Sequence, residues 1–165
     1  MGLLNCLFNI TKESAKIFDE FLQHVVDIEE CIIINNKNNK YSFKNLFLLK
    51  DLNLVDIGPF LQFNRELEPH KLTKFLMTEE LICFVINEDE IKYTLRIDDI
   101  YRLTNLGKEL AKYINHSNMN QREFLEIIKH IQSQNKKVKF YVHKILSYEN
   151  DKVVFDHKVD LLQIK

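Results

Sequence analysis

The sequence predicts an α+β protein in which one larger domain carries an appended C-terminal helix and β-hairpin. Segments with apolar residues at helical spacing alternate with short runs of β-branched and aromatic residues. The 165 residues include only 3 glycines and 2 prolines, and 45% of them are hydrophobic against 28% that are charged. This balance is that of a globular chain, and the length suits one domain with a small addition.

The first helix is expected from about residue 12 to residue 28. Thr11 can accept hydrogen bonds from the amides that follow it, and the negative charge of Glu13 suits the first turn. Apolar residues then recur at helical spacing. They are Ile17, Phe18, Phe21, Leu22, Val25 and Ile28.

A short strand and a second helix are expected next. Residues 31–34 form a β-branched run that ends in the polar turn 35–40. Ser42 then opens a helix over residues 43–53, and the chain turns at the Gly-Pro pair 58–59. The leucines of this helix and of the step after it form a ladder, which consists of Leu46, Leu49, Leu52 and Leu54.

Two β-rich runs, residues 81–87 and 91–97, are separated by the acidic turn 88–90. This pattern predicts a β-hairpin with an exposed tip. The preceding stretch, residues 60–80, shows no clear period. A third short run, residues 100–103, leads into a further helix.

That further helix is expected to begin after Thr104, whose hydroxyl can cap it. Gly107 has no side chain and so allows the helix to lie close to its neighbour. A polar linker at residues 116–120 separates it from an amphipathic helix over residues 124–131.

The C-terminal region ends in a predicted hairpin. Apolar residues alternate with polar ones over 138–142, and the polar turn 149–152 separates this run from residues 153–155. We therefore divide the chain into a domain at 1–115 and a helix-plus-hairpin subdomain at 119–165, packed on the first.

The apolar sides of the elements in the first domain should share one core. The residues expected there are Phe18, Phe21, Val25, Leu46, Leu49, Leu52, Leu54, Leu103 and Leu110. The apolar side of the helix at 124–131 should pack on that core or on the C-terminal hairpin.

The order of elements resembles a winged helix-turn-helix. In such proteins a leucine-rich helix steps into the wing through a Leu-Val pair, here Leu54 and Val55, and the wing returns through a Y-x-L-T-x-x-G pattern, here residues 101–107. More narrowly, residues 3–114 resemble the C-terminal module of an uncharacterised bacterial protein family. The matching residues are Leu7, Ile10, Thr11, Lys12, Glu13, Ala15, Phe18, Leu46, Leu49, Leu52, Leu54, Val55, Leu103, Thr104, Gly107, Lys108, Glu109 and Leu110. The resemblance implies a winged-helix-like fold and says nothing about activity, since none is established for the family.

The cysteines and the N-terminal residues indicate the cellular compartment in which the protein is expected. Cys6, Cys31 and Cys83 are odd in number and lie among apolar neighbours, which favours free thiols in a reducing compartment over disulfides. The first residues lack the basic region and cleavage site of a signal peptide, and no apolar run is long enough to span a membrane. We expect a cytoplasmic protein without membrane contact.

The sequence contains none of the common motifs for phosphate cradles, nucleophile elbows or zinc helices. Four histidines, at 116, 130, 143 and 157, fall on different predicted elements without the i, i+4 spacing of a metal-binding helix. The adjacent acidic pairs 79–80 and 98–99 point their side chains in different directions. We therefore expect no catalysis, no metal and no cofactor.

The leading functional hypothesis is a non-catalytic protein-interaction module. Phe47 and Leu48 occupy outward positions of the helix at 43–53, where they form either an exposed partner-binding patch or part of the core. The expected partner is another protein or a second copy of the chain.

The alternative hypothesis is a nucleic-acid-binding regulator. The net charge is −1, but residues 119–165 carry 9 basic and 6 acidic residues. Its candidate contacts are Lys136, Lys137, Lys139 and Lys144, with tyrosines nearby for stacking. The same lysines also suit a solvated strand face, because lysine commonly protects an exposed sheet edge. The acidic turn 88–90 argues against DNA binding through the predicted wing.

Overall fold

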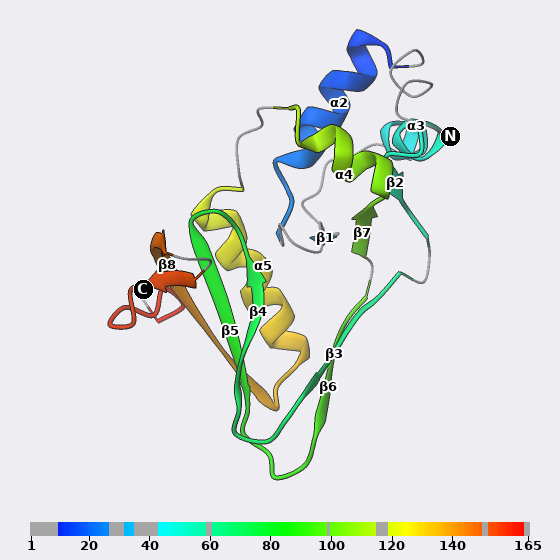
Figure 1. Cartoon of the computed structure of the whole chain (residues 1–165). Helices are drawn as coiled ribbons and strands as arrows, with labels where there is room; N and C mark the ends of the chain where they lie inside the picture. The colour runs from blue at the N-terminus through cyan, green and yellow to red at the C-terminus, as the bar shows by residue number, and fades with distance from the viewer. Residues whose placement is uncertain are drawn as a thin grey trace. The chain divides into compact units, whose positions relative to one another are not determined.

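The computed structural model describes residues 10–26, 32–34, 43–58, 61–98, 100–114, 119–149 and 152–163. They form an α+β protein whose chain divides into two compact units (Figure 1). Unit 1 comprises Met1–Leu61 and Asp98–Met119, and unit 2 comprises Gln62–Ile97 and Asn120–Lys165. Residues 62–97 thus belong with the C-terminal region, whereas the sequence had suggested that they belong with the N-terminal domain.

Unit 1 contains three helices and a small sheet among its described residues. The helices are α2 (Lys12–Leu22), α3 (Phe43–Asp51) and α4 (Asn105–Ala111). The strands are β1 (Ile32–Ile34), β2 (Val55–Asp56) and β7 (Ile100–Leu103). β7 lies in the middle, antiparallel to both neighbours, so the sheet order is β1-β7-β2.

Side chains that the sequence marks as caps begin two of these helices. The Ser14 amide donates to Thr11 Oγ1 over 3.1 Å, and the Thr11 amide donates to Ser14 Oγ over 2.8 Å, which closes a capping box at the start of α2. The Gly107 amide donates to Thr104 Oγ1 at the start of α4. The predicted end of the first helix at residue 28 is wrong, because α2 ends at Leu22 with Gln23 as its C-cap.

The core of unit 1 confirms the predicted set of residues. Seven of them are buried, and Val25 and Leu52 are partly buried and pack against the same cluster. The buried members of the cluster are Ile17, Phe18, Phe21, Leu22, Leu46, Leu49, Leu54, Val55, Leu103 and Leu110. Helical periodicity therefore placed the apolar sides of these elements correctly.

Unit 2 contains a four-stranded antiparallel sheet, a two-stranded ribbon and one helix among its described residues. The sheet order is β4 (Leu72–Met77), β5 (Leu81–Asn87), β8 (Val138–Glu149) and β9 (Lys152–Phe155). The ribbon pairs β3 (Phe63–Leu67) with β6 (Tyr93–Ile97). The helix is α5 (Gln121–Gln134).

Helix α5 packs against β8, and Figure 1 shows it lying across the sheet. Its apolar side, Phe124, Ile127, Ile128 and Ile131, is buried, as are Phe140 and Val142 of β8. The predicted C-terminal helix is confirmed, and so is the hairpin, because β8 pairs with β9 from Ile145–Phe155 to Glu149–Lys152.

The predicted hairpin between residues 81–87 and 91–97 is wrong. β5 pairs with β4 and with β8, whereas β6 pairs with β3. A nearly continuous apolar run suits a central strand with neighbours on both sides better than one arm of an isolated hairpin. The acidic turn 88–90 therefore connects two strands that do not pair with each other, and these strands form no wing.

The side chain of Asn87, at the end of β5, holds three segments of unit 2 together. It is fully buried. Its amide Nδ2 donates to the carbonyls of Leu67 (3.4 Å) and Ile91 (2.8 Å), and its Oδ1 accepts from the Asp89 amide. The His70 amide donates to the Asn87 carbonyl. These bonds fix the ends of the β3–β6 ribbon against the sheet.

Several predictions from sequence fall outside the described residues. They concern Cys6, Cys31, the turn 35–40, Ser42 and residues 116–118 of the expected linker.

Candidate functional site

The outward side of α3 carries an exposed aromatic side chain between two lysines. Phe47 is 54% exposed, although Leu46 and Leu49 beside it are buried at 6% and 0%. Lys44 and Lys50 lie one turn before and one turn after Phe47 and are exposed. We call Lys44, Phe47 and Lys50 the α3 face.

The structure separates the two residues that the sequence singled out on this helix. Leu48 is partly buried and packs against the core of unit 1. Of the two alternatives from sequence, an exposed patch or part of the core, Leu48 therefore fits the second. Phe47 alone is exposed. Helical spacing from the two buried leucines does not separate these residues, because Phe47 lies about 100° around the helix from Leu46 and Leu48 lies about 100° from Leu49. The difference comes from the tertiary packing of Leu48.

The lysines of the α3 face differ from several other lysines of the protein, which form ion pairs. Within the described parts of the chain, neither Lys44 nor Lys50 has an acidic partner, whereas Lys16 lies 3.7 Å from Glu20. The face is therefore apolar at its centre with positive charge available on either side.

The four lysines proposed for nucleic-acid binding lie on or near the start of β8, and two of them are paired. Lys137 Nζ lies 3.3 Å from Asp89 Oδ2, and Lys139 Nζ lies 2.6 Å from Glu88 Oε1. The hydrogen bond to Glu88 raises the pKa of Lys139, so this lysine keeps its charge. The acidic turn after β5 thus offsets part of the positive charge of the four lysines.

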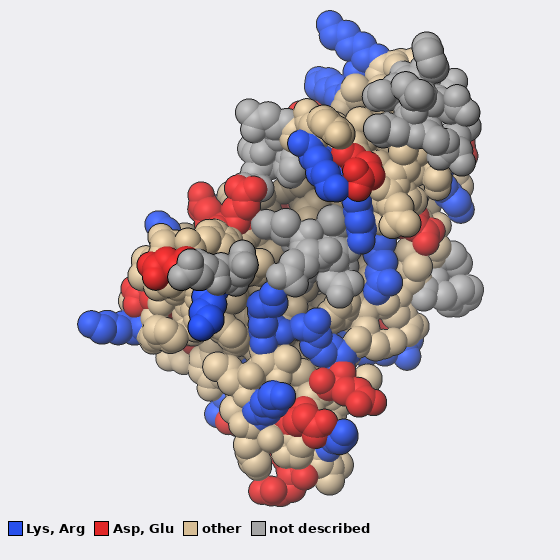
Figure 2. All heavy atoms as spheres, in the orientation of Figure 1, with Lys and Arg blue, Asp and Glu red and all other residues tan. Residues whose placement is uncertain are grey.

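The other two proposed lysines, Lys136 and Lys144, are exposed. In the described ranges they have no acidic partner. Figure 2 shows Lys and Arg side chains interspersed with Asp and Glu side chains over one face of the molecule. Acidic partners thus neutralise two of the four lysines, whereas a nucleic-acid groove requires a continuous basic surface.

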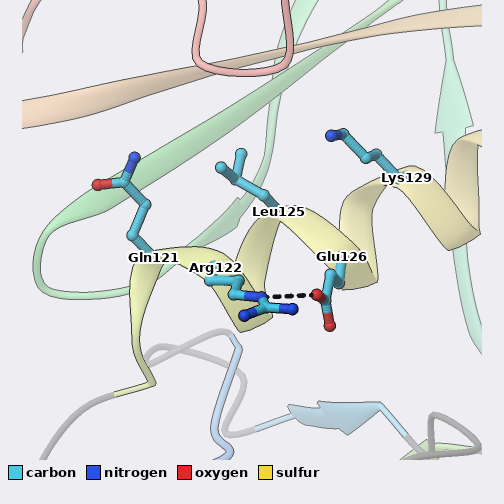
Figure 3. A pocket seen from close by; sticks show the side chains of 5 residues that line it. All are labelled: Gln121, Arg122, Leu125, Glu126 and Lys129. Carbon is cyan, nitrogen blue, oxygen red and sulfur yellow. Dashed lines mark hydrogen bonds and ion pairs between the residues drawn. The ribbon is translucent and has the colours of Figure 1, made fainter. Parts of the chain in front are cut away.

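The outer surface of α5 carries a hollow of about 460 Å³ (Figure 3). Gln121, Leu125 and Lys129 follow one another along one side of the helix, and Arg122 and Glu126 lie beside them. Arg122 Nε lies 3.1 Å from Glu126 Oε1. The one carboxylate in the lining is thus already paired with Arg122.

Cys83 lies in the core of unit 2 as a free, fully buried thiol. Burial raises its pKa well above the ordinary value, and the negative charge of Asp160 adds to the effect. A thiol of this kind is rarely ionised and therefore a poor nucleophile. Among the residues that the structure describes, no three His, Cys, Asp or Glu side chains are grouped as they would be around a metal ion.

Comparison of the chain with protein-family models, with curated proteins and with solved structures found no match. In the part of the chain that is described, no helix combines the length and the apolar character needed to cross a membrane.

Proposed function

We propose that this chain is a non-catalytic protein-interaction module that contacts its partner through the α3 face. The observation that carries the proposal is the exposure of Phe47 on a helix whose opposite side is fixed in the core. Large aromatic side chains contribute disproportionately to protein–protein binding when the partner covers them. A helix that is already packed loses little conformational freedom on binding.

The charges beside Phe47 suggest what kind of partner fits. Lys44 and Lys50 would border the contact with positive charge, so an acidic rim around an apolar pocket is the complementary surface. Asp51, exposed at the end of α3, lies one turn after Phe47 on the same side of the helix and offsets part of this positive charge. The partner is either another protein or a second copy of the chain.

A winged-helix-like arrangement of unit 1 is part of the proposal. It is supported by the sheet order β1-β7-β2, with α3 leading into β2 and β7 leading into α4. In this interpretation β2 and β7 form the base of the wing, and residues 62–97 are inserted where its tip would be. Fold analogy alone does not specify DNA binding, and α3 presents an aromatic side chain and few groups suited to base edges.

Each described group whose pKa is clearly shifted is shifted away from neutral pH, which fits the proposed non-catalytic function. The raised pKa values of Lys92 and Lys112 come first from hydrogen bonds to surface carboxylates, and that of Cys83 comes from burial. A catalytic base or nucleophile needs the opposite, a pKa brought close to neutral pH.

The nucleic-acid alternative is weaker, because Asp89 and Glu88 pair with Lys137 and Lys139. Titration of labelled duplex and single-stranded oligonucleotides at low and moderate salt tests it. Binding at low salt that weakens steeply as salt is added would favour this alternative, since each neutralised phosphate releases counterions.

The proposed contact is tested by replacing Phe47 with Glu, which places a charge at the centre of the α3 face. Tyr113→Glu is the matched control, because Tyr113 is 75% exposed, at the end of α4 in the same unit. We expect Phe47→Glu to remove partner binding or α3-mediated self-association, measured by light scattering and affinity capture, and Tyr113→Glu to preserve it. Identical masses and identical bound proteins for wild type and Phe47→Glu would refute the proposal.

A further inference from the structure

The two outer strands of the sheet in unit 2 differ in how their open edges are protected. On β4, the Arg65 guanidinium donates to the carbonyl of Lys74, and a bulge interrupts the strand between Lys74 and Leu76. Bulges and edge-directed charges are the usual devices that prevent edge strands from pairing with other chains. β9, at the other side of the sheet, pairs only with β8 among the described strands and contains no bulge of its own.

The backbone of β9 directs two residues outward. The Asp156 amide donates to the Lys144 carbonyl of β8 over 3.0 Å, so this residue points toward the sheet. Backbone groups of successive residues in an antiparallel strand point to alternate sides. The N–H and C=O groups of Val153 and Phe155 therefore point away from β8, where no described residue accepts or donates to them.

Past the end of β9, the chain itself occupies the next part of the β8 edge. The Leu161 amide donates to the Val142 carbonyl over 2.8 Å, and the Val142 amide donates to Asp160 Oδ1 over 3.1 Å. Along this edge of the sheet, the described residues therefore leave only β9 open to pairing with another strand.

The sequence of this edge, Lys152-Val-Val-Phe-Asp156, is complementary to itself when it is read in antiparallel directions. With a twofold axis at Val154, Lys152 lies opposite Asp156 of a second copy, and Val153 lies opposite its Phe155. Opposite charges and aromatic–β-branched pairs are the cross-strand neighbours that stabilise antiparallel strands. In this register the outward groups of Val153 and Phe155 also meet as hydrogen-bonded pairs.

The side chains of β9 keep some exposed surface for such pairing. Lys152 is exposed, and residues 153–156 are each only partly buried, although Val153 and Phe155 also pack against the cluster of Met77, Ile82 and Ile145. Asp156 uses Oδ1 to accept from the Lys158 amide, which leaves its other oxygen for a lysine across the axis. Leu146, at the bulge of β8 facing this end of β9, is 62% exposed and adds apolar surface beside the strand.

We propose that β9 pairs with β9 of a second copy about a twofold axis at Val154, which joins the two four-stranded sheets into one. The contact is isologous, so it closes as a dimer. It uses unit 2 and is independent of the α3 face.

The test uses two single variants with opposite charge changes, Lys152→Glu and Asp156→Lys. Each variant alone places like charges opposite each other twice, so each should dimerise about tenfold more weakly than wild type. An equimolar mixture pairs Glu with Lys and Asp with Lys across the axis, so it should recover dimer as the heterodimer. Sedimentation equilibrium measures the two variants and their mixture at chain concentrations up to roughly 1 mM. At such concentrations even a weak dimer is populated.

A second variant tests the backbone contact without changing charge. Val153→Pro removes an N–H that points away from β8, so the β8–β9 hairpin should persist, since proline is accepted at such edge positions. The dimer should be lost. Phe47→Glu should leave it intact, which separates this proposal from the α3 face.

A wild-type chain that stays monomeric over the whole concentration range would overturn the proposal, even if β9 then captured a strand of a different protein. A dimer that Lys152→Glu and Val153→Pro leave unchanged would overturn it as well. Should Asp156→Lys fail to fold, the responses of Lys152→Glu and Val153→Pro still decide the question.

Discussion

Gly107 of α4 approaches the backbone of Leu54 so closely that a Cβ atom on residue 107 would lie 2.1 Å from the Leu54 carbonyl oxygen. The same oxygen accepts a hydrogen bond from the Thr104 amide over 3.1 Å. The first turn of α4 is thus seated on the residue that precedes β2. This contact joins two segments of unit 1 that are separated in sequence by the residues inserted in unit 2.

The contact predicts that Gly107→Ala destabilises the protein. Because the obstacle is backbone and not the end of a flexible side chain, α4 must move, and overpacking of this kind costs roughly 1–3 kcal/mol. Urea denaturation measures the loss. Gly58→Ala is the control, since its Cβ would lie 3.5 Å from Leu61 Cγ, an ordinary contact. Equal stability of the two variants would contradict this account of α4.

Asn87→Ala should destabilise unit 2. The substitution removes the amide that bonds to the buried carbonyl of Leu67 and to the carbonyl of the exposed Ile91, and one unsatisfied buried group costs about 1–3 kcal/mol. Chemical denaturation followed by circular dichroism gives the free energy of unfolding. Asn64→Ala, at an exposed position of β3, should change it by less than about 0.5 kcal/mol. Similar losses of unfolding free energy for both variants would show that the hydrogen bonds of Asn87 do not stabilise unit 2.

The raised pKa of Cys83 predicts a loss of stability at high pH. The thiol stays protonated in the folded state, whereas in the unfolded chain it ionises near its ordinary value of 9.0. Its contribution to stability is therefore fully present below pH 9.0 and declines as pH rises toward the folded-state pKa, by at most about 1.4 kcal/mol per pH unit.

The decline is measured by urea denaturation between neutral pH and pH 10 in a Cys6→Ser, Cys31→Ser background, which leaves Cys83 as the one thiol. Adding Cys83→Ala should make the slope above pH 9.0 shallower, whatever it does to stability at neutral pH. Identical slopes with and without Cys83 would show that its thiol does not titrate differently in the folded state.

The core of unit 1 was predictable because its information is local. Leu46, Leu49 and Phe18 lie at helical spacing within their own elements, and Thr11 and Thr104 cap helices that begin right after them. The pairing of β5 was not predictable in the same way. Its partner β8 lies more than fifty residues away, and alternation within a strand does not say which strand lies beside it.

Two strands, β3 and β4, escaped sequence analysis altogether. β3 alternates weakly, with Phe63 and Leu67 buried and Arg65 between them, and the bulge at Phe75 breaks the period of β4.

The candidate surfaces show the same limit of sequence analysis. Spacing alone distinguished Phe47 from Leu46 and Leu49, but the pairing of Lys137 and Lys139 with the turn after β5 depends on tertiary structure.

The central claim, that the α3 face binds protein, is tested most directly by photo-crosslinking from position 47. A benzoylphenylalanine placed there keeps an aromatic ring at the site, and the same group at position 113 serves as the control. We predict a discrete adduct from position 47 that resists nuclease, is digested by protease and disappears when Lys44 and Lys50 are both changed to Glu. No adduct from position 47, the same adducts from both positions, or an adduct that nuclease removes would contradict the claim.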